Sequence, residues 1–248
     1  MEPEVKLISY TPDALALLIY TKNTRLRGGE TMESIAAWPE EKQLEHLAYM
    51  RDTIKSSWEF VDFVFEITGV DRAFTHQLVR TRHGSYAQQS QRTVDMRNAN
   101  YTEIGNDLYD LTVQDSLDTY KRLVNQGIPI QDARGILPTC IETEIIAKFN
   151  LRTLHEMAHV RLCTRAQGLY QAVFKLIKAA VVEVYPWAED FIKVACAWNG
   201  ICIFPRYEEC PIQQFTKKAT AKELATIETV WKNTEHVAVP RAINGKTM

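Results

Sequence analysis

The chain of 248 residues has no hydrophobic run long enough to cross a membrane. Residues 194–205 are uncharged, but this stretch is well short of the ~20 apolar residues that a spanning helix needs. The first ten residues, MEPEVKLISY, carry acidic side chains and no apolar segment of the length found in signal peptides. We therefore expect no membrane partner and no secretion.

Charge of one sign is not in excess either. The sequence has 29 lysines and arginines against 31 aspartates and glutamates, a formal net charge of -2. Such a balance argues against a protein that coats nucleic acid, although it allows a local basic pocket. Hydrophobic residues make up 46% and charged residues 24%, which is a globular composition that excludes long disorder, collagen and coiled coil.

Cysteine is scarce, with five residues spread over the second half of the chain. An odd and sparse set predicts free thiols in a reducing cytoplasm, which would be the host cytoplasm for a virus-encoded protein. A glycine-rich phosphate loop is also missing, because Gly28-Gly29 does not form a dinucleotide fingerprint.

Hydrophobic periodicity predicts one α+β domain over residues 1–248, with long helices and a mixed or antiparallel sheet. Strands are expected at residues 5–10 and 60–67, with Gly69 closing the second. A loop is expected at residues 24–33, and Asp71 is a candidate N-cap. The expected helices cover residues 14–20, 41–55, 72–79, 115–124 and 151–184, with Gly168 as a candidate interruption of the last.

Residues 77–92 read QLVRTRHGSYAQQSQR and concentrate arginines, a serine and amides where a helix is expected to give way to a loop. Guanidinium groups bind phosphate through paired, charge-assisted hydrogen bonds. Several cations on one short turn repel one another unless an anion lies between them. A nucleotide would satisfy this set, whereas the simpler interpretation is a solvated loop.

A second group comprises Arg134, Asn150, Arg152, Glu156, Arg161 and Arg165. Asn150 is also a candidate helix N-cap. Arg161 and Arg165 are four residues apart and would share a helix face, again with an anion between them. Ordinary surface arginines are the alternative.

His155-Glu156-Met157-Ala158-His159 is a literal H-E-x-x-H. On a helix this spacing can bind zinc, with the glutamate as general base of a metallopeptidase. A third ligand is lacking, because Glu183 would reach the metal only if the helix broke. Chance matches to so short a motif are common, and we expect no metal.

The first two groups together resemble the flavin-dependent thymidylate synthase family. The family signature is Arg-His-Arg, seven residues, then Ser-x-Arg, and here Arg80-Thr81-Arg82 is followed after seven residues by Ser90-Gln91-Arg92. The similarity extends from about residue 58 to residue 168. It includes Arg134 followed by Ile-Leu-Pro, Asn150-Leu-Arg152 and the segment that begins at Arg161.

This resemblance implies a fold like that of thymidylate synthase-complementing proteins and a homotetramer with active sites at subunit interfaces. It implies that methylenetetrahydrofolate supplies a carbon to C5 of dUMP to give dTMP, with FAD as cofactor and NADPH as reductant. The cofactor-binding residues would be Arg80, Thr81, Arg82, Gln88, Asn150, Arg152 and Glu156. The substrate-binding residues would be Gln77, Arg80, Gln88, Ser90, Arg92, Arg134 and Arg161. Arg161 would also be catalytic, because it stabilises negative charge on the uracil.

The chain departs from the family pattern at several positions. Thr81 replaces the central histidine, Phe60 a second flavin-facing histidine, Gln88 an acidic residue, Thr93 an aromatic residue and Glu156 an asparagine. Threonine donates a hydrogen bond but cannot carry imidazole charge. An altered flavin pocket that admits water would give 5-hydroxymethyl-dUMP instead of dTMP. A nucleotide-binding relative without catalysis and a zinc metallopeptidase are the remaining alternatives.

Overall fold

The computed structural model describes residues 2–25, 28–53, 55–202, 204, 210 and 217–225. It divides into two compact units, Met1–Val194 and Ala195–Met248. The expectation of a single functional domain stays a prediction. None of the helices in the described ranges has both the length and the apolar character of a membrane span.

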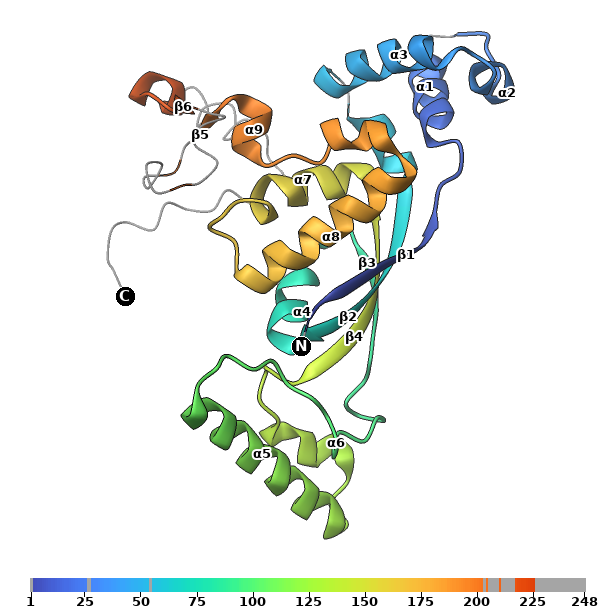
Figure 1. Ribbon diagram of the computed structural model, residues 1–248. Helices are drawn as coiled ribbons and strands as arrows, with labels where there is room; N and C mark the ends of the chain where they lie inside the picture. Colours follow the sequence, from blue (N-terminus) through green and yellow to red (C-terminus); the bar gives the residue numbers. More distant parts are fainter. Residues whose placement is uncertain are drawn as a thin grey trace. The chain divides into compact units, whose positions relative to one another are not determined.

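The first unit is built on a four-stranded sheet in the order β1 (Glu4–Tyr10), β2 (Asp62–Asp71), β4 (Glu142–Asn150) and β3 (Ser85–Gln88). All neighbouring strands in this sheet are antiparallel. The helices α7 (Leu151–Arg161) and α8 (Gly168–Val184) cover one face of it (Figure 1). The predicted α+β class with an antiparallel sheet is confirmed.

Buried and exposed side chains alternate along the central strands, so that one face of the sheet packs on the core. Phe63, Phe65 and Ile67 of β2 are fully buried, whereas Glu66 is exposed. In β4 the residues Thr143, Ile145, Ala147 and Phe149 are buried in the same way. A strand with period-two burial has one face on the core and one face open.

The strand β2 does not end at Gly69, so this prediction was wrong. Its register with β4 shifts between Ile67 and Val70, and Gly69 has a φ of +62° inside the strand. The glycine therefore forms a bulge. A Cβ atom at this position would lie 2.1 Å from the Glu2 carbonyl oxygen.

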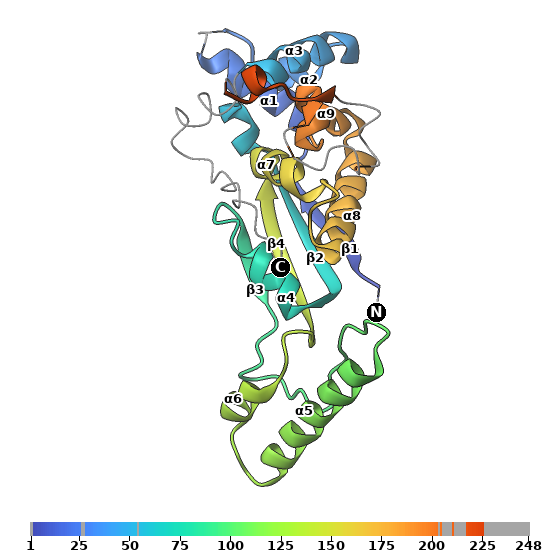
Figure 2. The ribbon, with the colours of Figure 1, turned by 90° about the vertical axis from the view of Figure 1, so that its left-hand side faces the viewer.

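The remaining helices of this unit lie around the sheet. Near the N-terminus are α1 (Ala14–Arg25), α2 (Met32–Ala36), α3 (Glu40–Asp52) and the 3₁₀ helix η1 (Ser56–Phe60). The segment between β2 and β4 holds α4 (Arg72–Leu78), α5 (Asp107–Asn125), α6 (Ile130–Ala133) and η2 (Arg134–Ile136), and α8 is followed by η3 (Pro186–Asp190). The helices α5 and α6 stand beyond one end of the sheet (Figure 2). They surround a small core that includes Val113, Leu117 and Tyr120.

The expected helix over residues 151–184 is two helices. It breaks between α7 and α8, and α8 begins at Gly168. Arg165 therefore lies in the connecting turn and does not share a helix face with Arg161, contrary to the prediction.

The second unit contains α9 (Ala195–Asn199) and the short parallel pair β5 (Ile201–Cys202) and β6 (Lys217–Lys218).

Candidate functional site

The turn Arg80-Thr81-Arg82 connects α4 to β3. The helix α4 begins at Asp71, whose Oδ1 accepts a hydrogen bond of 2.7 Å from the Phe74 amide, as the predicted N-cap. The turn that follows α4 is fixed from β3, because the Tyr86 hydroxyl lies 2.7 Å from the Thr81 carbonyl oxygen and 3.0 Å from that of Leu78. Arg80 and Arg82 themselves are exposed on this rigid turn.

Gly84 allows the turn to approach the sheet. A Cβ atom there would lie 2.4 Å from the Tyr86 hydroxyl and 2.6 Å from Cε1 of Phe149. We expect Gly84→Ala to lower the free energy of unfolding by about 1–3 kcal/mol, since overpacking costs this much. Thermal or denaturant unfolding measures the effect. Gly168→Ala is the matched control, because its Cβ would meet no atom within 4 Å; equal stabilities of the two variants would contradict the close packing.

Gln88 and Ser90 lie at the end of β3. The Gln88 amide nitrogen lies 2.8 Å from the Thr75 hydroxyl oxygen, which ties β3 to α4. The Ser90 hydroxyl oxygen accepts a 3.2 Å hydrogen bond from the Arg92 amide. The Arg92 side chain is exposed.

Arg72 and Arg134 form a pair of like charges, of which the sequence predicted only Arg134 as a binding residue. Arg72 Nη2 donates to the Gln89 carbonyl oxygen at 2.6 Å, while its Nε is buried without a hydrogen-bond partner among the described residues. Burial, and then the positive charge of Arg134, lower the pKa of Arg72. Two nearby guanidinium groups and a buried unpaired N–H donor are an arrangement that could bind an anion.

The N-terminal half of α7 carries Arg152 and Glu156, and Asn150 precedes it. Asn150 is the N-cap, with its side-chain oxygen 2.8 Å from the Thr153 amide. Arg152 makes ion pairs of 2.5 Å with Glu59 and 3.2 Å with Glu156. Arg152 thus links Glu156 of its own helix to Glu59 of η1.

Arg161 is the last residue of α7, and its guanidinium carbon lies 4.0 Å from the centre of the Tyr170 ring in α8. A cation over an aromatic face is held in place by the ring quadrupole. The Tyr170 ring also packs edge-on against Phe74 of α4, at 5.0 Å between centres. Arg161 is therefore fixed beside the helix that leads to the arginine turn. Gln77, on the same helix, donates to the Gln167 side chain.

Within one chain, the described contacts divide the predicted residues into three neighbouring groups. The α4–β3 segment, with Arg161 beside it, holds Gln77, Arg80, Thr81, Arg82, Gln88, Ser90 and Arg92. The start of α4 brings Arg72 to Arg134. The start of α7 holds Asn150, Arg152 and Glu156.

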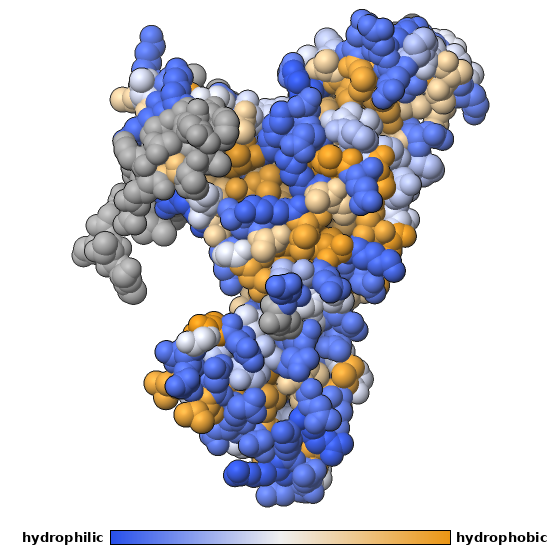
Figure 3. Space-filling view, in the orientation of Figure 1, coloured by the Kyte–Doolittle hydropathy of each residue, from blue (hydrophilic) through white to orange (hydrophobic). Residues whose placement is uncertain are grey.

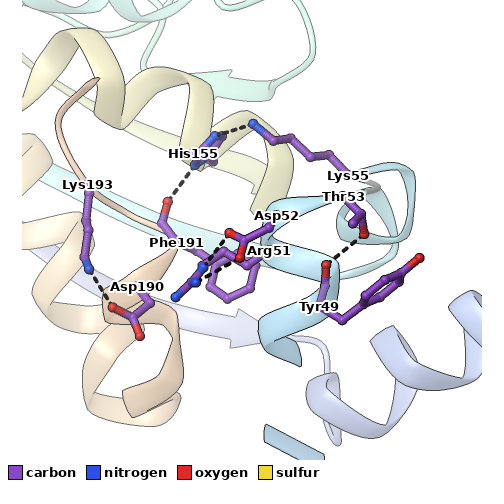
Figure 4. Close-up of polar contacts among 9 residues, drawn as sticks. All are labelled: Tyr49, Arg51, Asp52, Thr53, Lys55, His155, Asp190, Phe191 and Lys193. Atoms are coloured by element: carbon purple, nitrogen blue, oxygen red, sulfur yellow. Dashed lines mark hydrogen bonds and ion pairs between the residues drawn. The ribbon is translucent and has the colours of Figure 1, made fainter. Parts of the chain in front are cut away.

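His155 of the H-E-x-x-H segment is engaged at both ring nitrogens (Figure 4). Nδ1 lies 2.7 Å from the Phe191 carbonyl oxygen, and Nε2 lies 2.9 Å from Lys55 Nζ. Nδ1 therefore carries the proton and Nε2 accepts one from the lysine. In the described ranges, no three His, Cys, Asp or Glu residues are grouped to hold a metal.

Burial is the main reason why the pKa of His155 falls to about 3 and that of His159 to about 4, and nearby positive charge adds to it. In the unfolded chain the two histidines become protonated near pH 6.5, whereas in the folded chain they stay neutral to lower pH. We therefore expect the free energy of unfolding to fall as pH drops from about 6.5 toward 4, by up to about 1.4 kcal/mol per pH unit for each histidine. Denaturant titrations at several pH values measure this slope. His83→Gln, which changes an exposed histidine, should keep the wild-type slope, and His155→Gln should reduce it. Identical slopes in the two variants would refute the role of His155.

The structure is that of an α+β protein with arginines at both ends of α4, Arg72 at its start and Arg80 and Arg82 after its end. The family model for thymidylate synthase complementing proteins matches residues 6–187. The chain is 32% identical over 199 residues to the flavin-dependent thymidylate synthase of Geobacter sulfurreducens, covering 73% of this chain and 85% of that one. It is 35% identical over 220 residues to that of Pyrococcus furiosus, covering 80% and 88%. The chain belongs to the thymidylate synthase complementing protein family.

Solved structures share the fold. A flavin-dependent thymidylate synthase from Helicobacter pylori, in complex with FAD and dUMP, superimposes with a TM-score of 0.65 at 20% identity and covers 78% of this chain and 100% of that one. A UMP/dUMP methylase from Streptomyces cacaoi, bound with 5-Br dUMP, has the same TM-score at 17% identity, covering 78% and 97%.

Proposed function

We propose that the protein transfers the one-carbon unit of methylenetetrahydrofolate to C5 of dUMP and gives dTMP, with FAD as cofactor and NADPH as reductant. One observation carries this proposal beyond family membership. Arg80, Arg82, Arg92 and Arg134 form no ion pair with a described residue, whereas Arg51, Arg97 and Arg152 are paired with carboxylates. Unpaired guanidinium groups gathered on and beside one structural segment favour an anionic ligand.

The phosphate of dUMP is assigned to Arg72 and Arg134, with Ser90 and Arg92 completing the set. Buried charge-assisted hydrogen bonds of this kind fix the position of a nucleotide as well as its affinity. Gln77 and Gln88 supply neutral hydrogen bonds to the base and the sugar.

Arg161 is assigned to the uracil ring. C5 attacks a carbon electrophile only when negative charge can accumulate on the ring, and a fixed guanidinium beside the N3–O4 edge stabilises that charge. Tyr170 keeps this guanidinium from swinging away. Loss of the C5 proton to solvent then restores the C5–C6 double bond.

The residues present fit a cofactor with a pyrophosphate and a planar ring. Arg80 and Arg82 offer exposed cations on the turn that Tyr86 holds. The amide nitrogen of Asn150 is not used by its cap, and Arg152 keeps donors beyond those given to Glu59 and Glu156. Bound flavin would supply the hydride for the methyl product, while the protein orients and polarises the nucleotide.

We assign the complete site to a homotetramer. Arg80, Arg82 and Arg92 are exposed in one chain, and α5 exposes Leu108 and Leu111 at 75% and 69%. Apolar surface is visible on this part of the molecule in Figure 3. Exposed apolar side chains are typical of surfaces that another subunit covers. A reducing cytoplasm is the location that fits the buried free thiols of Cys140 and Cys202.

Mass analysis of the product tests the proposal. The protein is incubated with dUMP, methylenetetrahydrofolate, FAD and NADPH, and we expect dTMP. A product heavier by one oxygen would identify 5-hydroxymethyl-dUMP, the outcome that Thr81 and Phe60 would permit. Binding of dUMP without any new product would identify a noncatalytic relative, and no binding at all would refute the proposal.

A further inference from the structure

A chain of hydrogen bonds runs beneath Gln88. Its amide nitrogen lies 2.8 Å from the hydroxyl oxygen of Thr75 and 3.4 Å from that of Thr143. The Thr75 hydroxyl in turn lies 3.2 Å from the carbonyl oxygen of Arg72. Thr75 and Thr143 are buried, with exposures of 0% and 3%.

The assignment of donors and acceptors in this series of hydrogen bonds fixes the orientation of the Gln88 carboxamide. A threonine hydroxyl has one proton to donate, and Thr75 gives it to the Arg72 carbonyl. The Thr75 oxygen must therefore accept from Gln88, so the amide NH₂ group points inward. The carboxamide oxygen accepts no hydrogen bond from a described residue and is not among the buried unsatisfied atoms. It consequently faces the surface at the end of β3.

The same turn of α4 links Gln88 to the guanidinium of Arg72. Arg72, whose carbonyl ends the chain, donates its own Nη2 to the carbonyl oxygen of Gln89, the next residue after Gln88. Gln88 and the guanidinium of Arg72 are thus held by one set of backbone and hydroxyl groups.

We propose that Thr75 and Thr143 are positioning residues, which turn Gln88 so that its oxygen accepts a hydrogen bond from a donor on the substrate nucleotide. This inference rests on the proposed function. Two groups of dUMP share the required chemistry, the N3–H of the base and the 3′-hydroxyl of the sugar.

A glutamate at position 88 would break the arrangement. Its carboxylate has no N–H to give, so Thr75 would have to release the Arg72 carbonyl and donate to the carboxylate instead. The neutral amide is therefore the side chain that suits the buried threonine pair.

The test measures dUMP affinity of the full-length, FAD-loaded protein by calorimetry. We expect Thr75→Val to raise the Kd for dUMP about five- to tenfold, the loss of roughly one hydrogen bond. Thr75→Ser keeps the hydroxyl and should stay within about twofold of the wild type. Thr143→Val and Gln88→Met give the same readout if Thr75→Val does not fold.

Two nucleotide analogues then identify the donor. If the Gln88 oxygen accepts from the sugar, wild type and Thr75→Val bind 2′,3′-dideoxy-UMP with equal affinity. If it accepts from the base, they bind N3-methyl-dUMP with equal affinity.

A folded Thr75→Val protein with unchanged Kd, or a serine variant as weak as the valine one, would overturn the inference. A persistent difference between wild type and Thr75→Val with both analogues would overturn it as well. Failure of the wild type to bind dUMP would instead be a failure of the proposed function, so the two are distinguishable.

Discussion

Replacing Arg161 with alanine should lower kcat about 10²–10³-fold and change dUMP affinity much less. The expected size is that of removing one fixed charge-stabilising group from a transition state. The effect concentrates on kcat because the negative charge on the uracil ring develops only as C5 attacks. Steady-state kinetics, with dUMP binding measured separately, give the two numbers.

Arg161→Lys separates charge from geometry. The lysine keeps the positive charge but loses the planar guanidinium that lies over Tyr170. It should recover only part of the lost rate. Tyr170→Leu keeps Arg161 but removes the aromatic ring that holds its guanidinium. We expect this variant to have a lower kcat and an unchanged affinity for dUMP. Wild-type kcat in Arg161→Ala would remove the electronic role of this residue.

The second large effect is expected for Arg72→Met. Breaking a buried charged pair at a binding site costs about 2–5 kcal/mol, which is at least about 30-fold in Kd. The loss should appear for dUMP and not for deoxyuridine, which has no phosphate to contact Arg72 or Arg134. Calorimetry with both ligands measures the difference.

Arg51→Met is the matched control for this prediction. Arg51 is already paired with Asp52 at 2.9 Å on α3, and its loss should leave both affinities unchanged. An equal loss for dUMP and deoxyuridine in Arg72→Met would show that Arg72 supports the fold and does not bind the phosphate.

Much of the site was accessible from the sequence because its chemistry is local. The spacing from Arg80 to Arg92 spans one helix end, one turn and one short strand, and Asp71 is a typical N-cap before an apolar segment. The family resemblance then added the distant Arg134 and Arg161. The roles of these residues stay predictions, whereas the family and the fold class are confirmed.

The strands β3 and β4 were missed for different physical reasons. β3 is a four-residue edge strand in a polar segment, and only pairing with β4 defines it. In β4 the alternation of Thr143, Ile145, Ala147 and Phe149 was a usable signal. Threonine and alanine at two inner positions weaken the apolar contrast on which periodicity depends.

Arg72 was missed because its role depends on distant residues. Nothing in the local sequence distinguishes an arginine that follows a helix cap from a surface arginine. Arg72 is a candidate binding residue because it is partly buried, donates to the Gln89 carbonyl oxygen and lies near the charge of Arg134. Arg134 is more than 60 residues away in the chain. Long-range placement of this kind is set by the tertiary fold.

A crystal structure of the assembled protein with FAD and 5-bromo-dUMP tests the central claim most directly, because bromine marks C5 by its anomalous signal. We predict the nucleotide phosphate at Arg72 and Arg134, and the uracil edge beside an Arg161 guanidinium from a subunit of the assembly. A bromine peak remote from every copy of Arg161, with the phosphate bound elsewhere, would contradict the account.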